Sequence, residues 1–340
     1  MTQDAFFAAV KRGDIAPVYF FQGEEEHIKE HALAALRKRL LPEGLEALNE
    51  TILQNPPAEA IIESAETLPM MADRRLVLVR DSALLGSGKA AGEAEDSARL
   101  VAYLDNPPPS ACIVFYLRGM PDGRKKLTQA LAKKAEVVKF DRLGDADLQR
   151  WIAQQLQRMG KQITREDAAY VSFIAGNELM VLSGELEKVA AHAGDAEMVT
   201  RADIDAVVTR TLESNVFEMV DALVAGKEAE AFARLRIMLE NGEARIGILA
   251  MMSRQYRNLL HLKLMQQGGV PEAELQRRIG VPPFAMRRLF AQSRAASQEE
   301  LRAKLDLCVD TDYAIKSGKM REDIALERAM IRLCSPGMTA

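Results

Sequence analysis

Short apolar runs recur through the first 140 residues, separated by segments with helical periodicity. The runs are VYFF (18–21), TIL (51–53), LVLV (76–79), CIVFYL (112–117) and VVKF (137–140). Because their apolar positions are continuous rather than alternating, these strands should be covered on both faces, as in a mostly parallel sheet. Amphipathic segments at 25–41 and 57–68 supply covering helices. The pattern predicts a three-layer α/β domain over residues 1–141.

From about residue 145 the apolar positions recur every three to four residues, which predicts helices only. Glycines that follow apolar or basic last turns fit helix C-caps. These are Gly160, Gly194, Gly226, Gly242 and Gly318. TRAD (200–203) predicts a capping box with Asp203 in place of the usual glutamate. A boundary near LESN (212–215) divides this part into a small helical domain, 142–212, and a larger one, 213–340.

The segment 84–97, LLGSGKAAGEAEDS, is rich in glycine, alanine and serine. It predicts a mobile surface loop inside the first domain.

Composition places the chain among globular proteins, with 48% hydrophobic and 28% charged residues in 340. No apolar run reaches the roughly 20 residues that a membrane helix needs, and the N-terminus lacks the features of a signal peptide. We therefore expect a cytoplasmic protein. Three widely spaced cysteines, Cys112, Cys308 and Cys334, predict packing residues rather than disulfides or a metal knuckle.

The net charge of −4 is unevenly distributed. Residues 244–340 carry 16 Lys and Arg and 10 Asp and Glu, a surplus of +6, which leaves −10 for residues 1–243. A basic C-terminal part is compatible with contact to a polyanion such as DNA, and equally with a solvated helical surface.

An α/β domain followed by a helical bundle raises the question of nucleotide binding. A phosphate-binding loop G-x-x-x-x-G-K-[ST] would begin at Gly23 and place its lysine at Lys29. Ile28 stands where the second glycine is needed and Glu30 where the hydroxyl is needed. Glutamates at 24–26 add negative charge where phosphates would lie. The sequence therefore predicts a degenerate site that does not bind ATP.

Other candidate chemistry is weak. GSGKAAG (86–92) has Ala83 and Ala90 where a phosphate loop needs glycine and a hydroxyl. His27 and His31 share a helix face, but no third ligand follows at a suitable spacing. We expect no metal, no cofactor and no catalytic residues.

Residues 271–294 outline a helix, a GVPP turn and a second helix with Arg287, Arg288 and Arg294, as in a DNA-reading helix-turn-helix. The exposed face offers only Gln292 as a polar partner for a base. We favour a packing corner, with Phe284, Leu289 and Phe290 buried and the arginines in solvent.

Four stretches of the chain, taken in order, resemble the delta subunits of the bacterial DNA polymerase III clamp loader. They are PVYFFQGEEEHIKEHALAALR (17–37), AETLPMMADRRLVLVRD (65–81), GNELMVLSGELEKVAAHAG (176–194) and the series from RQYRNLLHLKLMQQGG (254–269) to DTDYAIKSGK (310–319). The resemblance covers nearly the whole chain. It implies an AAA+ (RecA-like) first domain that has lost its nucleotide site, a helical lid and a helical collar for oligomerisation.

The resemblance also implies partners: the beta sliding clamp, the gamma, tau and delta prime subunits, and primed DNA in the assembled complex. It assigns clamp binding to two adjacent apolar side chains that match Met70 and Met71, in a corner that also includes Leu68 and Arg74. Two roles are open for Arg74 and Arg75: contact with the clamp at the rim of this corner, or only capping of the start of the following strand. The chain would open the clamp without hydrolysing ATP, and would belong to a DNA-directed DNA polymerase by association only.

Three points stay open from the residues alone. Met70 and Met71 could instead fill the chain's own core. Lys316, Lys319 and Arg321, close together near a helix end, are a weak candidate for phosphate contact. An active AAA+ ATPase and a sequence-specific helix-turn-helix regulator are the alternative functions.

Overall fold

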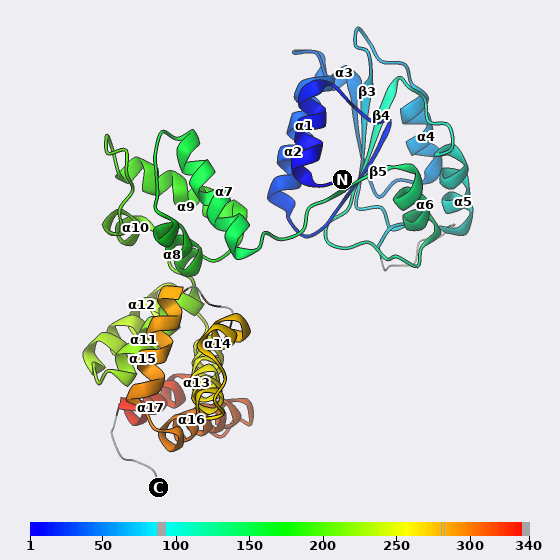
Figure 1. Cartoon of the computed structure of the whole chain (residues 1–340). Helices are drawn as coiled ribbons and strands as arrows, with labels where there is room; N and C mark the ends of the chain where they lie inside the picture. Colours follow the sequence, from blue (N-terminus) through cyan, green and yellow to red (C-terminus); the bar gives the residue numbers. More distant parts are fainter. Residues whose placement is uncertain (87–92, 280, 282, 335–340) are drawn as a thin grey trace. The chain divides into compact units, whose positions relative to one another are not determined.

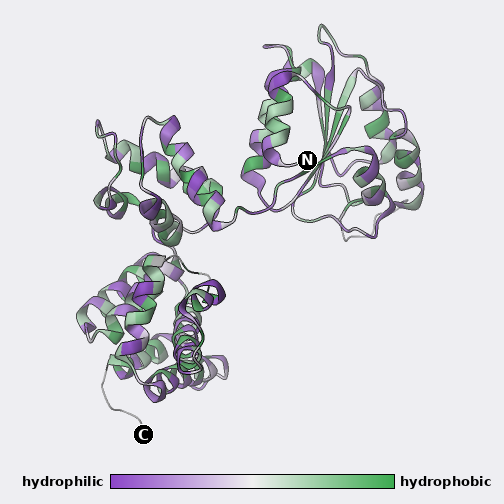
Figure 2. Cartoon of the chain, in the orientation of Figure 1, coloured by the Kyte–Doolittle hydropathy of each residue, from purple (hydrophilic) through white to green (hydrophobic). Residues whose placement is uncertain are grey.

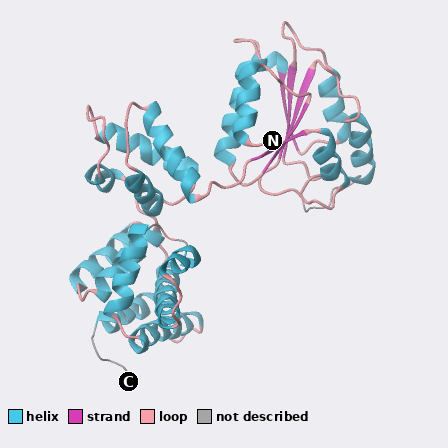
Figure 3. Ribbon diagram, viewed as in Figure 1, coloured by secondary structure: helices cyan, strands magenta, loops and turns pink. Residues whose placement is uncertain are grey.

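The computed structural model describes residues 1–86, 93–279, 281 and 283–334. The chain divides into two compact units, Met1–Gly144 and Asp145–Ala340. Figure 3 shows the strands confined to the first unit, and the described part of the second unit is built from helices. The predicted order, an α/β part followed by an all-α part, is therefore confirmed. The further boundary at 212–213 stays a prediction.

The first unit contains a sheet of five parallel strands in the order β2-β3-β4-β1-β5. The strands are β1 (Val18–Gln22), β2 (Glu50–Gln54), β3 (Arg75–Arg80), β4 (Ala111–Tyr116) and β5 (Glu136–Lys139). Each overlaps one of the five predicted apolar runs. The prediction of a mostly parallel sheet is confirmed.

Helices cover both faces of this sheet (Figure 1). They are α1 (Gln3–Arg12), α2 (Glu26–Leu40), α3 (Glu46–Asn49), α4 (Ala58–Glu66), α5 (Glu93–Tyr103) and α6 (Lys126–Lys134). Side chains alternate between the two layers, as a pleated strand requires. Phe20 packs in a cluster with residues of α4, α5 and α6, whereas Tyr19 and Phe21 meet the ring of Phe6 in α1 edge-on. Figure 2 shows the apolar strands between these layers.

Two details of the first unit differ from the sequence expectations. Strand β2 lies at the sheet edge and exposes Ile52, so it is not covered on both faces. The predicted loop 84–97 is shorter, because Leu84 and Leu85 are buried and α5 already begins at Glu93. Acidic residues in the first turn of α5 favour this earlier start, since they oppose the positive helix end. Residues 87–92, and with them most of GSGKAAG, lie outside the described residues.

The second unit begins with four short helices. These are α7 (Asp145–Arg158), α8 (Arg165–Ala175), α9 (Leu179–His192) and α10 (Arg201–Val207). The predicted capping box at Thr200 and Asp203 is present, and the bonds from Thr200 lower the pKa of the Asp203 carboxyl. The five glycines predicted as C-caps all have positive φ, the left-handed conformation that ends helices.

Seven further helices enclose the larger apolar core of the unit. They are α11 (Leu212–Val224), α12 (Glu228–Glu240), α13 (Arg245–Gln267), α14 (Glu272–Ile279), α15 (Pro283–Ala295), α16 (Gln298–Lys316) and α17 (Glu322–Cys334). The long helix α13 packs against α11, α14, α15, α16 and α17. Cys308 is buried there, as Cys112 is in the sheet, and burial raises the pKa of both thiols to about 12. Along the described residues, no helix has the length and apolar character to cross a membrane.

Candidate functional site

The segment between α4 and β3 exposes three large apolar side chains. We call residues 67–73 the corner. Leu68 is 77% exposed, Met70 56% and Met71 82%. Exposure on this scale excludes the interpretation that the two methionines fill the core of this unit. Clustered apolar exposure on a fixed backbone is typical of a surface that another molecule covers.

A buried asparagine holds the backbone of the corner. The Met70 amide donates to Oδ1 of Asn49 at 2.7 Å, and Nδ2 of Asn49 donates to the Met70 carbonyl at 2.9 Å. The same Nδ2 also donates to the Leu45 carbonyl. Asn49 is fully buried at the end of α3. Its side-chain amide both donates to and accepts from the Met70 backbone, as a neighbouring strand would. The side chain of Met70 is left free to project.

The corner is also shaped by its backbone conformation. Met71 has φ of +53°, in the left-handed region that a side chain with Cβ rarely adopts. This turn reverses the chain within a few residues after the end of α4 at Glu66. A conformation of this kind persists only where surrounding contacts fix it, and the paired bonds from Asn49 lie on the neighbouring residue.

The two arginines after the corner have different environments. Arg75 is buried at the start of β3, where its guanidinium donates to the Thr67 carbonyl and to the Thr51 hydroxyl. Desolvation lowers the pKa of Arg75. Of the two roles predicted for Arg75, strand start is therefore the one that its burial allows. Arg74 is half-buried and donates to the Ile15 carbonyl at 2.7 Å, beside the corner.

The turn after β1 is filled by the chain itself. Gly23 has φ of +122°, and a Cβ built on it would lie 2.2 Å from the Phe140 carbonyl oxygen. The Glu25 amide donates to that oxygen at 2.9 Å. The glycine is thus required by close approach of the Phe140 backbone. The Glu25 amide, which would face a phosphate in a nucleotide-binding loop, is bonded to this backbone carbonyl instead.

Lys29 and Glu30 are engaged in an internal network. The Lys29 ammonium is fully buried and donates to Glu26 at 2.6 Å and to the Leu117 carbonyl at 2.7 Å. Arg80 donates to both carboxylate oxygens of Glu30. Tyr116 donates to Glu26, and burial together with these carboxylates raises its pKa. Lys29 and Glu30, which align with a phosphate loop, are thus bonded to other groups of this unit, and Ile28 is buried.

Two family models match the chain. One, described as DNA polymerase III, delta subunit, matches residues 19–141. The other, described as the DNA polymerase III delta subunit, C-terminal domain, matches residues 213–333. The first match includes both the corner and the filled turn after β1.

The chain belongs to the DNA polymerase III delta subunit family. It is 28% identical to DNA polymerase III subunit delta of Bacillus subtilis over 96% of this chain and 95% of that protein. It is 22% identical to a probable DNA polymerase III subunit delta of Aquifex aeolicus over 51% of this chain and 50% of that protein. The solved structure of a Bacillus subtilis DNA clamp loader delta protein matches 98% of this chain and 99% of its own, with a TM-score of 0.61 and 27% identity.

The helix pair at 271–294 in this delta-family chain packs on the core of the second unit, which is the interpretation that the sequence favoured. Leu289 and Phe290 are buried and Phe284 packs against the same core. Gln292, which a groove reader would need on its surface, is 2% exposed and donates to Asp221. One detail was wrong: Arg288 is not simply solvated, because it pairs with Asp221.

The remaining sequence candidates are surface groups in the structure. Lys316 pairs with Asp312 at 2.8 Å and Arg321 with Asp323 at 2.7 Å. The Lys319 ammonium lies 4.9 Å from the centre of the Tyr313 ring. All three cations are exposed at the end of α16 and the following turn.

The rings of His27 and His31 lie 4.6 Å apart on α2. Burial and the neighbouring ring lower the pKa of His27. Within the described ranges, no group of three or more potential metal-ligating side chains comes together.

Sequence reasoning located the corner but missed Asn49. Nothing in the local pattern EALNETIL marks this asparagine, because its partner lies 21 residues further along the chain. Burial of an asparagine next to an edge strand is visible only once α3 and the corner are placed together. Phe140 was missed for the same reason, since it follows β5, which lies beside β1 in the sheet although the two strands are far apart in the sequence.

Proposed function

We propose that this delta-family chain binds the beta sliding clamp through Leu68, Met70 and Met71 and favours its open form without hydrolysing ATP. The observation that carries the proposal is the exposed apolar corner on a backbone held by Asn49. Arg74, half-buried at the edge of the corner, contributes a polar contact at the rim.

The side chains suit this role energetically. Fully burying one large apolar side chain contributes roughly 1.5 to 3 kcal/mol, and Met71 has most of its surface still to bury. Methionine is unbranched and polarizable, so it adapts to a pocket formed by another protein. Because the backbone of the corner is already fixed, little ordering cost offsets this gain on binding.

Opening a ring requires that the corner bind the open form more tightly than the closed form. A ligand shifts an equilibrium only by its differential affinity for the two states. Wedge-like insertion of Met70 and Met71 near a subunit interface of the clamp provides such a difference. No phosphate chemistry on this chain is needed for that step.

The filled turn after β1 supports the absence of ATP hydrolysis here. A nucleotide would have to displace the Phe140 backbone and face Glu24, Glu25 and Glu26. We infer that ATP acts on the other clamp-loader subunits, gamma or tau, and thereby exposes or hides the corner. Titration of the isolated chain with ATP should give no saturable binding, and saturation would favour the active ATPase.

The clamp contact is tested by a pull-down with Met70→Ala/Met71→Ala protein. The proposed complex buries both thioethers against the clamp. Their loss should therefore reduce clamp retention by at least tenfold, since about 1.4 kcal/mol corresponds to one decade in affinity. Met180→Ala/Met198→Ala is the matched control, because both methionines are exposed in the second unit. Equal retention of all three proteins would reject the proposal.

The helix-turn-helix regulator is disfavoured by burial of Gln292 and by the internal pair of Arg288. A gel-shift comparison of random duplex with primed template separates the two functions. The proposed loader subunit should show no preference for one duplex sequence over another.

A further inference from the structure

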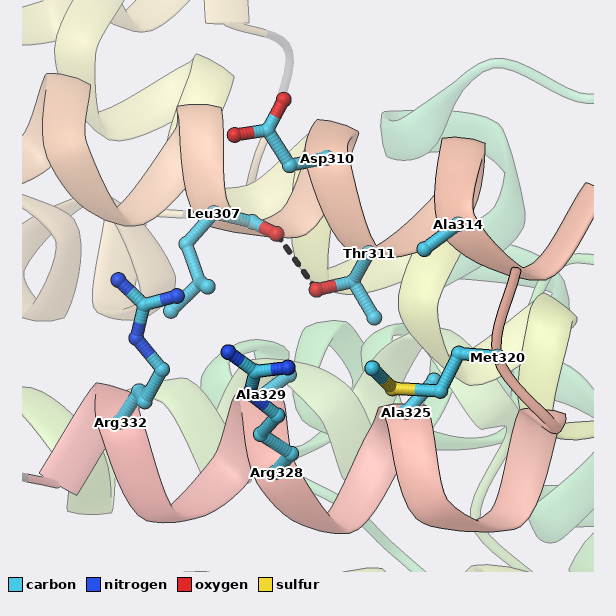
Figure 4. A pocket seen from close by; sticks show the side chains of 9 residues that line it. All are labelled: Leu307, Asp310, Thr311, Ala314, Met320, Ala325, Arg328, Ala329 and Arg332. Atoms are coloured by element: carbon cyan, nitrogen blue, oxygen red, sulfur yellow. Dashed lines mark hydrogen bonds between the residues drawn. The ribbon is translucent and has the colours of Figure 1, made fainter. Parts of the chain in front are cut away.

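A cavity of about 160 Å³ opens between α16 and α17 (Figure 4). The two helices run antiparallel, joined by the turn at Gly318. Leu307, Thr311, Ala314, Met320, Ala325 and Ala329 form its mostly apolar walls. Asp310 lies on the α16 side, and Arg328 and Arg332 lie on the α17 side.

These three charged side chains have no partner among the described residues. Arg328 and Arg332 are four residues apart, so they stand on the same side of α17. Neither forms an ion pair or a side-chain hydrogen bond within the described part of the chain, and nor does Asp310. This differs from the end of the same helix pair, where Lys316 and Arg321 each pair with a carboxylate. The cavity thus presents two guanidinium groups that no carboxylate of the described chain neutralises.

Exposed apolar side chains border this charged centre. Val309 and Tyr313 on α16 are 51% and 61% exposed, and Ile324 and Ile331 on α17 are 52% and 59% exposed. The first pair is spaced by four residues and the second by seven, so each pair forms one stripe. Val309 and Tyr313 lie next to Asp310 on the surface of α16, and Ile324 and Ile331 lie next to Arg328 on the surface of α17. Because the two helices are antiparallel, these neighbours emerge on the same side of the pair. We call these four residues with Asp310, Arg328 and Arg332 the α16–α17 face.

We propose that the α16–α17 face docks a helix of another clamp-loader subunit, one that carries a carboxylate between apolar residues. The carboxylate would receive Arg328 and Arg332, and the apolar residues would cover the two stripes. This inference rests on the proposed function and on the resemblance, which implies that residues 213–340 form a collar that assembles with other subunits of the loader. It adds which surface makes the contact and the chemistry of the segment that it accepts.

The charge pattern favours a protein helix over nucleic acid. A phosphate backbone approaching Arg328 and Arg332 would also meet Asp310, whose carboxylate repels it. A helix can present an acidic side chain to the arginines and a donor to Asp310. Four exposed apolar side chains are consistent with this choice, because the buried centre of protein interfaces is apolar with arginine enriched.

The test uses full-length Arg328→Glu/Arg332→Glu protein mixed with the purified remaining loader subunits. Assembly, measured by titration and by size-exclusion chromatography, should weaken by about a hundredfold, since reversing the charges places like charges against the partner carboxylate. Val309→Ser/Ile331→Ser should weaken assembly independently. Arg257→Glu/Arg277→Glu is the matched control, because both of these arginines are exposed on other helices and it makes the same change in charge.

Three results would overturn the proposal. One is unchanged assembly of either α16–α17 variant, and another is an equal loss in the control. The third is normal assembly with reduced affinity of the loader for primed DNA, which would assign the face to phosphate. If the charge reversal prevents folding, as judged by circular dichroism, Arg328→Gln/Arg332→Gln gives the same comparison. Clamp retention by the isolated chain should stay normal throughout, which separates this test from that of the corner.

Discussion

At the scale of single residues, the corner depends on a buried side chain that lies outside it. Asn49 supplies both a donor and an acceptor to the backbone of Met70, and it does so from a fully buried position. Neither aspartate nor leucine can replace it, because aspartate lacks the donor and leucine lacks both groups. The backbone position from which Met70 projects thus depends on the buried side-chain amide of Asn49 in α3.

Asn49→Ala should weaken clamp binding although both methionines remain. It removes three hydrogen bonds and leaves the polar groups of Met70 without partners, so we expect a loss of roughly 1–3 kcal/mol in folding stability. The corner then samples several conformations, and clamp affinity falls through the added ordering cost. Denaturant unfolding and clamp titration measure the two effects separately. An unchanged affinity in a destabilised protein would show that Asn49 serves the fold only.

The sequence alone predicted the corner, but it did not predict the contacts that hold its backbone. Leu68, Pro69 and the two methionines form one contiguous stretch before an arginine pair, and contiguity is visible in a sequence. Asn49 and Arg75 act through tertiary contacts with Met70, Thr67 and Thr51, which no periodicity reports. Local pattern therefore predicts which residues project, and the structure adds what holds them.

At the scale of elements, helix α2 contains Ile28, Lys29 and Glu30, three of the residues that align with a phosphate loop. Its start is stabilised by ion pairs within the unit: Lys29 with Glu26, and Glu30 with Arg80. Strands β1, β3 and β4 were predictable because their runs are uniformly apolar. The start of α5 was missed, since glycine and alanine before Glu93 resemble a loop and the acidic first turn gives a weaker signal.

Lys29→Met tests whether α2 has any role toward ATP. The substitution leaves the Leu117 carbonyl and the Glu26 carboxylate without their buried donor, so the melting temperature should fall. ATP turnover by the assembled loader should not change, because the proposed nucleotide sites are on other subunits. Lys38→Met, an exposed position of the same helix, is the control. A specific loss of turnover in the Lys29 variant would mean that the turn after β1 takes part in nucleotide hydrolysis.

The histidine pair on α2 predicts an acid-sensitive stability. The pKa of His27 is lowered from 6.5 in the folded chain, first by burial and then by His31. The unfolded chain therefore binds more protons as the pH falls below about 6.5, and stability decreases until the folded pKa is reached. His27→Gln should flatten the dependence of unfolding free energy on pH across this window, and His31→Gln should flatten it less. Identical pH profiles for wild type and His27→Gln would contradict the assignment.

At the scale of the whole molecule, the two proposed contact surfaces lie on different units. The first unit carries the corner, and the α16–α17 face lies in the basic stretch 244–340 of the second unit. This distribution suits a chain that contacts a protein ring through one unit and a larger assembly through the other. Two separable surfaces on one chain allow each contact to be removed without the other.

The cations near the end of α16 give the last prediction, which concerns DNA. In the assembled loader, Lys316→Glu/Lys319→Glu should lower affinity for primed DNA and reduce the salt slope of binding by about two, since each phosphate contact releases nearly one counterion. Lys316 is already paired with Asp312, so the reversal also leaves that carboxylate exposed and adds repulsion. Lys133→Glu/Lys134→Glu is the matched control, because Lys134 is likewise paired, with Asp105. DNA affinity and salt slope that match wild type would assign Lys316 and Lys319 to a solvated surface, and the basic surplus of residues 244–340 would then require another explanation.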